Sequence, residues 1–133
     1  YSFKISNNDG ASSSIYNFSN INSEEMFSDR NFSMKEEIKI KSISLDSFFK
    51  KEKIDPKNFN HWVIDVQGSE LDLLKGAKNS LKFCKSLIVE VSTKDIYKGG
   101  AIWEDVKNFL TEENFEPFNE PERIHADILF LRK

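Results

Sequence analysis

Residues 61–77 read HWVIDVQGSELDLLKGA, and this stretch decides the fold class. An apolar run reaches Asp65, a short polar turn holds Gln67 and Gly68, and a helix is predicted from about residue 69 to residue 81. The helix is predicted because apolar side chains recur at helical spacing, which places them on one face. A buried strand, a turn and a helix form the repeating unit of open α/β sheets, in which ligands bind beyond the carboxyl ends of the strands.

The composition is that of one soluble globular domain: 133 residues, of which 38% are hydrophobic and 31% charged. The net charge of −3 and the lack of a basic stripe exclude nucleic acid as an expected partner. No apolar run approaches the roughly 20 residues of a membrane helix, so no membrane partner is expected either. Cys84 is the only cysteine, which excludes an internal disulfide and favours a reducing, cytoplasmic location.

The order of the predicted elements gives the fold class. Strands are predicted at residues 1–5, 13–18, 38–45, 61–66, 86–91, 115–118 and 126–131, and helices at 46–52, 69–81 and 102–110. The first two strands are expected to form a hairpin, and Asp46 is expected to cap the first helix. Residues 19–34 are expected to be a loop that can order on a ligand, with a helical turn at residues 24–27. From residue 61 onward, strands alternate with helices, which predicts a mostly parallel α/β sheet with an antiparallel last strand.

Residues 65–77 (DVQGSELDLLKGA) resemble the signature of the FkbM-type methyltransferases, which reads approximately D-V-[EQ]-G-x-E-x-x-V/L-L-K-G-A. Residues 44–49, 5–10 and 87–91 are similar to further elements of that family, so the resemblance covers nearly the whole chain. It implies a Rossmann-like, class I fold and the transfer of a methyl group from S-adenosylmethionine to a hydroxyl oxygen. The acceptor implied by the resemblance is a small molecule or a glycan.

The glycines of the chain depart from the pattern of that family. Such enzymes hold the cofactor with a glycine-rich turn after the first strand, and no G-x-G follows an apolar strand here. The resemblance therefore implies that residues 1–133 are the C-terminal part of a single Rossmann-like methyltransferase domain, with an incomplete sheet whose full strand order is 3-2-1-4-5-7-6. Strand 1 would cover the strand at residues 61–66, so this edge is expected to be open and to favour self-association.

Asp65, Gln67 and Gly68 are the first candidate site residues. Asp65 is a candidate catalytic residue that orients the acceptor hydroxyl or accepts its proton. Together with Gln67 and Gly68, it is also a candidate contact for S-adenosylmethionine. The alternative is structural: Asp65 caps the following helix, Gly68 only permits a tight turn, and Gln67 is solvated.

Glu70 and Glu90 complete the set of candidate catalytic residues. Glu70 begins a helix, where the helix dipole alone would favour a carboxylate. Glu90 interrupts an apolar strand, where a carboxylate is costly unless it has a partner; the alternative to a role beside Asp65 is a pair with a lysine. The three carboxylates also suggest a divalent metal as a further hypothesis, because hard cations bind carboxylate oxygens. His125 is expected to be a solvated loop residue.

The sequence leaves two classes of function open. The first is an S-adenosylmethionine-dependent O-methyltransferase of the FkbM type, of which this chain is a part. The second is a non-catalytic Rossmann-like module that binds a partner or serves a structural role. A strand and a glycine-rich turn upstream of Tyr1 would favour the enzyme, and their absence would favour the module.

Overall fold

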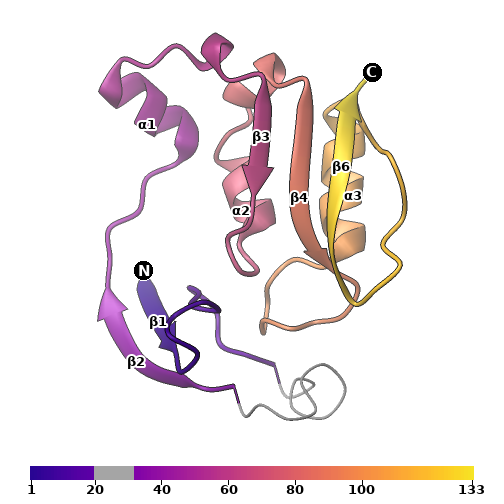
Figure 1. The fold of residues 1–133 in the computed structure, drawn as a ribbon. Coiled ribbons are helices and arrows are strands. Elements are labelled where there is room, and N and C mark those ends of the chain that lie inside the picture. Colours follow the sequence, from indigo (N-terminus) through magenta and orange to yellow (C-terminus); the bar gives the residue numbers. More distant parts are fainter. Residues whose placement is uncertain (20–31) are drawn as a thin grey trace.

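The computed structural model describes residues 1–19 and 32–133, which form two β-sheets and three α-helices (Figure 1). The larger sheet contains β3 (His61–Ile64), β4 (Ser86–Ser92), β5 (Phe115–Pro117) and β6 (His125–Arg132), and the smaller sheet contains β1 (Ser2–Ser6) and β2 (Met34–Lys39). The helices are α1 (Leu45–Glu52), α2 (Glu70–Lys75) and α3 (Trp103–Glu112), with short 3-10 helices η1 (Pro56–Asn58) and η2 (Ser80–Phe83). The helical turn predicted at residues 24–27 lies outside the described residues.

The strands of the larger sheet follow the order β3-β4-β6-β5, which equals the 4-5-7-6 half of the expected order. β3 and β4 are parallel, whereas β6 is antiparallel to both β4 and β5. The prediction of an antiparallel last strand is thus confirmed, but the prediction of a mostly parallel sheet is wrong. The reason is that β6 inserts between β4 and β5, so that a single reversed strand creates two antiparallel pairs.

The N-terminal strand has a different partner from the expected one. β1 pairs with β2, and its contact with the predicted second strand of the hairpin is a single bridge from Lys4 to Ser14. The chain after β1 folds into a compact turn, in which Ser6 and Asn8 hydrogen-bond to Ser12. After the bridge at Ser14, the chain leaves β1 and reaches the loop after β4, where Phe18 forms a bridge to Tyr97.

The helices start within one residue of the predicted positions. The N-cap residue of α1 and the length of the helix after β3 differ from the prediction. Ser44, and not Asp46, caps α1 by accepting from the backbone N–H of Ser47 at 3.2 Å. The Asp46 carboxylate instead accepts from Ser80 Oγ and from the backbone N–H groups of Asn79 and Ser80 at the start of η2. These hydrogen bonds hold the pKa of Asp46 low against the effect of burial. The helix predicted at residues 69–81 is split into α2 and η2.

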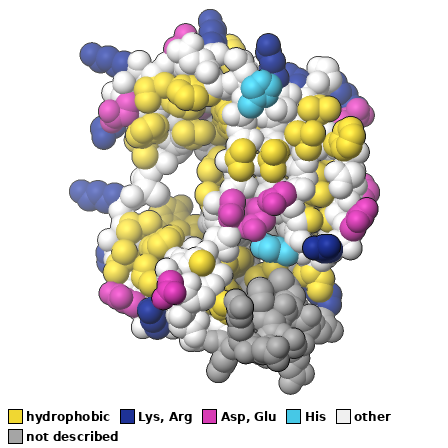
Figure 2. Space-filling model, viewed as in Figure 1, with side chains coloured by type: hydrophobic (Ala, Val, Ile, Leu, Met, Phe, Trp, Pro, Cys, Tyr) yellow, Lys and Arg dark blue, Asp and Glu magenta, His cyan; other side chains and the backbone are white. Residues whose placement is uncertain are grey.

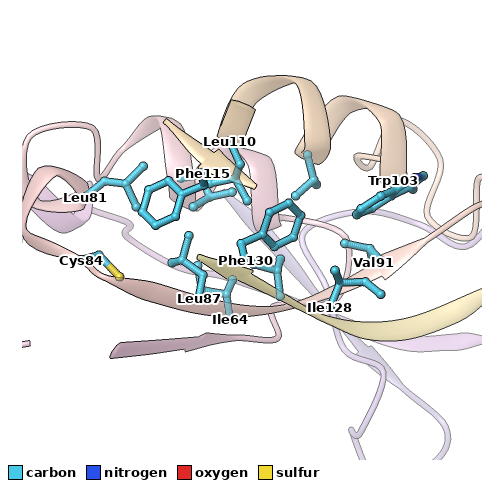
Figure 3. Packing of buried hydrophobic residues seen from close by; sticks show 13 residues of the cluster. Ile64, Leu81, Cys84, Leu87, Val91, Trp103, Leu110, Phe115, Ile128 and Phe130 are labelled. Carbon is cyan, nitrogen blue, oxygen red and sulfur yellow. The ribbon is translucent and has the colours of Figure 1, made fainter. Parts of the chain in front are cut away.

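The core lies between one face of the larger sheet and the helices α2 and α3 (Figure 3). It is formed chiefly by Leu87, Val89 and Val91 of β4, Ile128 and Phe130 of β6, Leu74 of α2, and Trp103, Val106 and Leu110 of α3. Figures 1 and 2 view the opposite face of the sheet, on which hydrophobic side chains are visible. Val63 is 77% exposed there and Ile88 39% exposed, so this face is not covered by the described residues. No helix in the described parts of the chain has the length and apolar character needed to cross a membrane.

Candidate active site

Three segments that are distant in sequence meet at one end of the larger sheet. β3 and β4 run parallel in a register that brings Asp65, just after β3, and Glu90 of β4 to the same end. β4 and β6 run antiparallel with Ser92 opposite His125, which brings the start of β6 to that end as well. Figure 2 shows the resulting group of acidic side chains with a histidine beside it. The candidate residues Asp65 and Glu90 are therefore neighbours, as the sequence predicts.

The Gln67 side chain lies at the centre of this group. Its amide nitrogen donates to Asp65 Oδ1 at 2.6 Å and to Glu90 Oε2 at 3.0 Å. Its side-chain oxygen accepts from the Tyr97 hydroxyl at 2.6 Å, and its backbone oxygen accepts from Ser14 Oγ at 2.6 Å. The alternative of a solvated Gln67 is thus wrong. Sequence reasoning missed Tyr97 and Ser14 because no local pattern marks them as partners of this residue.

The turn between β3 and α2 is held by Glu70. This side chain is only 4% exposed, and its Oε1 accepts from the backbone N–H groups of Val66 and Gly68, each at 3.1 Å. Burial raises the pKa of the Glu70 carboxyl, and hydrogen bonds from the backbone oppose this rise. Within the turn, Gln67 and Gly68 have φ values of 51° and 93°, and an added Cβ at Gly68 would lie 2.8 Å from Tyr97 Cδ2. Glycine is therefore required there for conformation and for space.

The three candidate carboxylates are close enough to share a ligand. One oxygen of each of Asp65, Glu70 and Glu90 lies within 4.8 Å of the other two, a spacing that fits a metal ion. The Gln67 amide donates to two of these carboxylates and weakens their repulsion without a cation. Metal binding by these residues stays a prediction.

His125 is the partner of Glu90. Its Nε2 lies 2.9 Å from Glu90 Oε1, and its Nδ1 lies 2.7 Å from Ser92 Oγ. The hydrogen bond with Glu90 raises the pKa of the imidazole, and partial burial opposes this rise. The prediction of a solvated histidine is wrong, as is the alternative of a lysine partner for Glu90. The pairing depends on the register of β6 against β4, which no local sequence pattern indicates.

The Glu90–His125 pair predicts a pH-dependent stability. The folded pKa of His125 is raised above its unfolded value of about 6.5, so the folded protein binds this proton more tightly. The stabilisation is fully present below about pH 6.5 and is lost as the pH rises through the folded pKa. Urea unfolding at a series of pH values should show this loss in the wild type and not in Glu90→Gln. Glu116→Gln, which breaks the exposed pair with Lys133, is the control and should keep it.

A small cavity of about 10 Å³ lies beside the group, lined by residues that include Gly68, Glu70, Glu90, Tyr97 and His125. This volume is close to the minimum that one water molecule needs, roughly 10–15 Å³. S-adenosylmethionine, a nucleoside with an amino-acid tail, does not fit into it. The residues that line the cavity therefore do not by themselves form a cofactor site.

The larger sheet carries Asp65 and Glu70 after β3 and Glu90 near the end of the adjacent parallel strand β4, and this edge is where α/β sheets bind ligands. Residues 1–117 match the family described as Methyltransferase FkbM domain, and the chain belongs to this family. The resemblance noted in the sequence is thus confirmed, and the family indicates a methyltransferase. All five candidate site residues lie within the matched range, whereas His125 lies beyond it. No curated protein and no solved structure shows significant similarity to the chain.

Proposed function

We propose that this chain supplies the acceptor side of an S-adenosylmethionine-dependent O-methyltransferase that acts on a hydroxyl of a small molecule or a sugar. In this proposal the chain is the C-terminal part of a single Rossmann-like domain. The observation that carries the proposal is the Asp65 carboxylate, which is exposed at the end of β3 and is hydrogen-bonded to Gln67. A carboxylate at this place can meet a ligand in the region where ligands of such sheets bind.

The three carboxylates have different environments, and the proposal gives them different roles. Asp65 is exposed, whereas Glu70 is buried and accepts from the backbone. Glu90 is engaged by Gln67 and His125. Asp65 is therefore the group that orients the acceptor hydroxyl and takes its proton when the methyl group is transferred. Glu90 and Glu70 contribute to catalysis indirectly, because they maintain the negative charge and the geometry of the site around Asp65.

The cofactor side of the reaction is proposed to depend on residues outside this chain. The cavity lined by Glu70, Glu90, Tyr97 and His125 is too small for S-adenosylmethionine, and the candidate contacts Gln67 and Gly68 already have partners within the chain. We therefore expect the isolated 133-residue chain to show no appreciable binding of S-adenosylmethionine in titration calorimetry. Binding in the micromolar range would show that the chain holds a complete cofactor site and would contradict this division of roles.

The activity itself is tested with the full-length protein. It is incubated with S-adenosylmethionine labelled in the methyl group and with a panel of hydroxylated small molecules and sugars. The proposal expects the label to appear in the acceptor as a methyl ether, a bond that resists mild acid and base. Label transfer to a nitrogen or to a carboxylate of the acceptor would show a methyltransferase of a different kind.

A second candidate function, a non-catalytic module that binds a partner, is favoured by the uncovered sheet. β3 is an edge strand of the sheet, and Val63 on it is 77% exposed. An open apolar edge favours pairing with another chain. We expect the isolated chain to self-associate in sedimentation velocity, and Val63→Lys to reduce this association. Phe118→Lys, at a residue that is 74% exposed but outside the sheet strands, is the control. A wild-type chain that stays monomeric at high concentration would contradict the expectation.

A further inference from the structure

We propose that Tyr97 is a positioning residue for methyl transfer, because its hydroxyl fixes the Gln67 amide in the orientation that joins Asp65 to Glu90. The inference rests on the function proposed above, since it concerns the same site. Tyr97 lies in the loop between β4 and α3, and its hydroxyl is 2.6 Å from Gln67 Oε1. It acts on the site through Gln67 and is not itself a catalytic residue.

The Tyr97 ring has little freedom to move. It is 6% exposed and stacks on Phe18, with ring centroids 5.3 Å apart and 28° between the planes. It also lies against the backbone of Gly68 and Gly100, where an added Cβ would approach the Tyr97 side chain to 2.8 Å and 3.0 Å. Rings packed this closely do not change rotamer without moving their neighbours. The hydroxyl therefore has one position relative to the turn that contains Gln67.

The Gln67 amide has two orientations, which differ by a half turn of the side chain. The two neighbouring carboxylates favour the one in which the amide oxygen faces the Tyr97 hydroxyl and accepts its hydrogen bond. In the observed orientation, the amide nitrogen faces the carboxylates of Asp65 and Glu90. In the other, the amide oxygen would face both carboxylates and would be repelled by them. Burial raises the pKa of the Tyr97 phenol, and the nearby carboxylates add to this, so the hydroxyl keeps its proton to donate. Its second acceptor, the Ser12 carbonyl, is farther away at 3.3 Å.

The consequence for the site is preorganisation. With the amide fixed, Asp65 is held at a set distance from Glu90 through a shared donor. An exposed carboxylate without such a restraint would sample several rotamers, and only some of them would face an acceptor. Groups that are already in place cost no reorganisation when the reaction occurs. Tyr97 should therefore affect the rate of the chemical step and leave cofactor binding unchanged.

The first test observes the Gln67 amide directly. Gln67 is the only glutamine of the chain, so a nitrogen-15 label on glutamine side chains gives a single NH₂ signal in NMR spectra. In Tyr97→Phe, exchange of these protons with water should accelerate by about tenfold, the factor that one hydrogen bond of ordinary net strength represents. Tyr16→Phe is the matched control, because Tyr16 donates to Asp72 at 2.5 Å and does not hydrogen-bond to Gln67. An unchanged Gln67 signal in Tyr97→Phe would overturn the proposal.

A reciprocal test serves if Tyr97→Phe is too unstable to study. The chain has three tyrosines, and a carbon-13 label at Cζ reports the hydrogen bond of each hydroxyl. Gln67→Met keeps the length of the side chain and removes the acceptor. The Tyr97 signal should shift, and the Tyr16 signal should not. A Tyr97 signal that stays in place would also overturn the proposal.

Activity measurements separate this proposal from the proposed function. In the full-length protein, Tyr97→Phe should lower kcat by about tenfold and leave KM for S-adenosylmethionine unchanged. A change in KM alone would overturn the positioning role. If the wild-type protein transfers no methyl group, the proposed function fails, whereas the NMR result still decides whether Tyr97 positions Gln67.

Discussion

Replacing Asp65 by Asn in the full-length protein should lower the rate of methyl transfer by roughly 10²–10⁴-fold, the usual scale for the loss of a positioned acid or base. Asn keeps the size of the side chain and a carbonyl oxygen that can accept from the Gln67 amide, as Asp65 Oδ1 does at 2.6 Å. It removes the negative charge and the ability to take a proton. Single-turnover methyl transfer, measured with saturating acceptor and cofactor, gives the size of the effect.

Two further measurements distinguish a catalytic role of Asp65 from a structural one. The melting temperature of Asp65→Asn should stay close to that of the wild type, because Asp65 is exposed and the Ser69 position, not Asp65, is the N-cap of α2. Asp72→Asn is the matched control: it removes an acid from the first turn of the same helix, and it should keep most of the activity. Full activity in Asp65→Asn, or a melting temperature far below that of the wild type, would show that Asp65 has only a structural role.

Most of the strands and helices could be predicted from the sequence, because their signals are local. The apolar run before Asp65, the helical spacing after it and the apolar β4 each lie within a few residues. The cluster of Asp65, Gln67 and Glu70 was predictable for the same reason, since one turn carries all three. Glu90 joined them through the expectation that consecutive parallel strands lie side by side, and β3 and β4 do so.

The partners of these residues could not be predicted, because they depend on long-range register. His125 meets Glu90 only because β6 pairs with β4 from the end at Ser92. Tyr97 reaches Gln67 because the loop after β4 folds back over the turn before α2, where Gly68 leaves room for its ring. A histidine before a strand and a tyrosine before two glycines are common in sequences, and neither pattern specifies a contact. The antiparallel direction of the last strand was predicted, but it pairs with both β4 and β5, so the sheet is less parallel than expected.

Replacing Glu70 by Ala should lower the free energy of unfolding by roughly 2–6 kcal/mol, because each donor left without a partner inside the protein costs about 1–3 kcal/mol. Two partly buried donors lose their partner in this variant: the backbone N–H groups of Val66 and Gly68, which both donate to Glu70 Oε1 at 3.1 Å. Urea unfolding of the 133-residue chain measures the loss. Glu104→Ala is the matched control: Glu104 is an exposed acid in the first turn of α3, and its removal should cost at most about 1 kcal/mol.

Glu70→Gln separates the hydrogen bonds of Glu70 from its charge. The amide keeps an oxygen for the two N–H groups and avoids the burial of a carboxylate in a side chain that is only 4% exposed. The folded pKa of Glu70 is raised above its unfolded value, so its charged form opposes folding. Its contribution to stability is therefore greatest below the unfolded pKa, about 4.3, and falls as the pH rises through the folded pKa. At neutral pH, Glu70→Gln should consequently be far more stable than Glu70→Ala. If both variants unfold equally early, the charge and not the acceptor oxygen holds the turn, and Glu70 then becomes a candidate for direct contact with a cationic ligand.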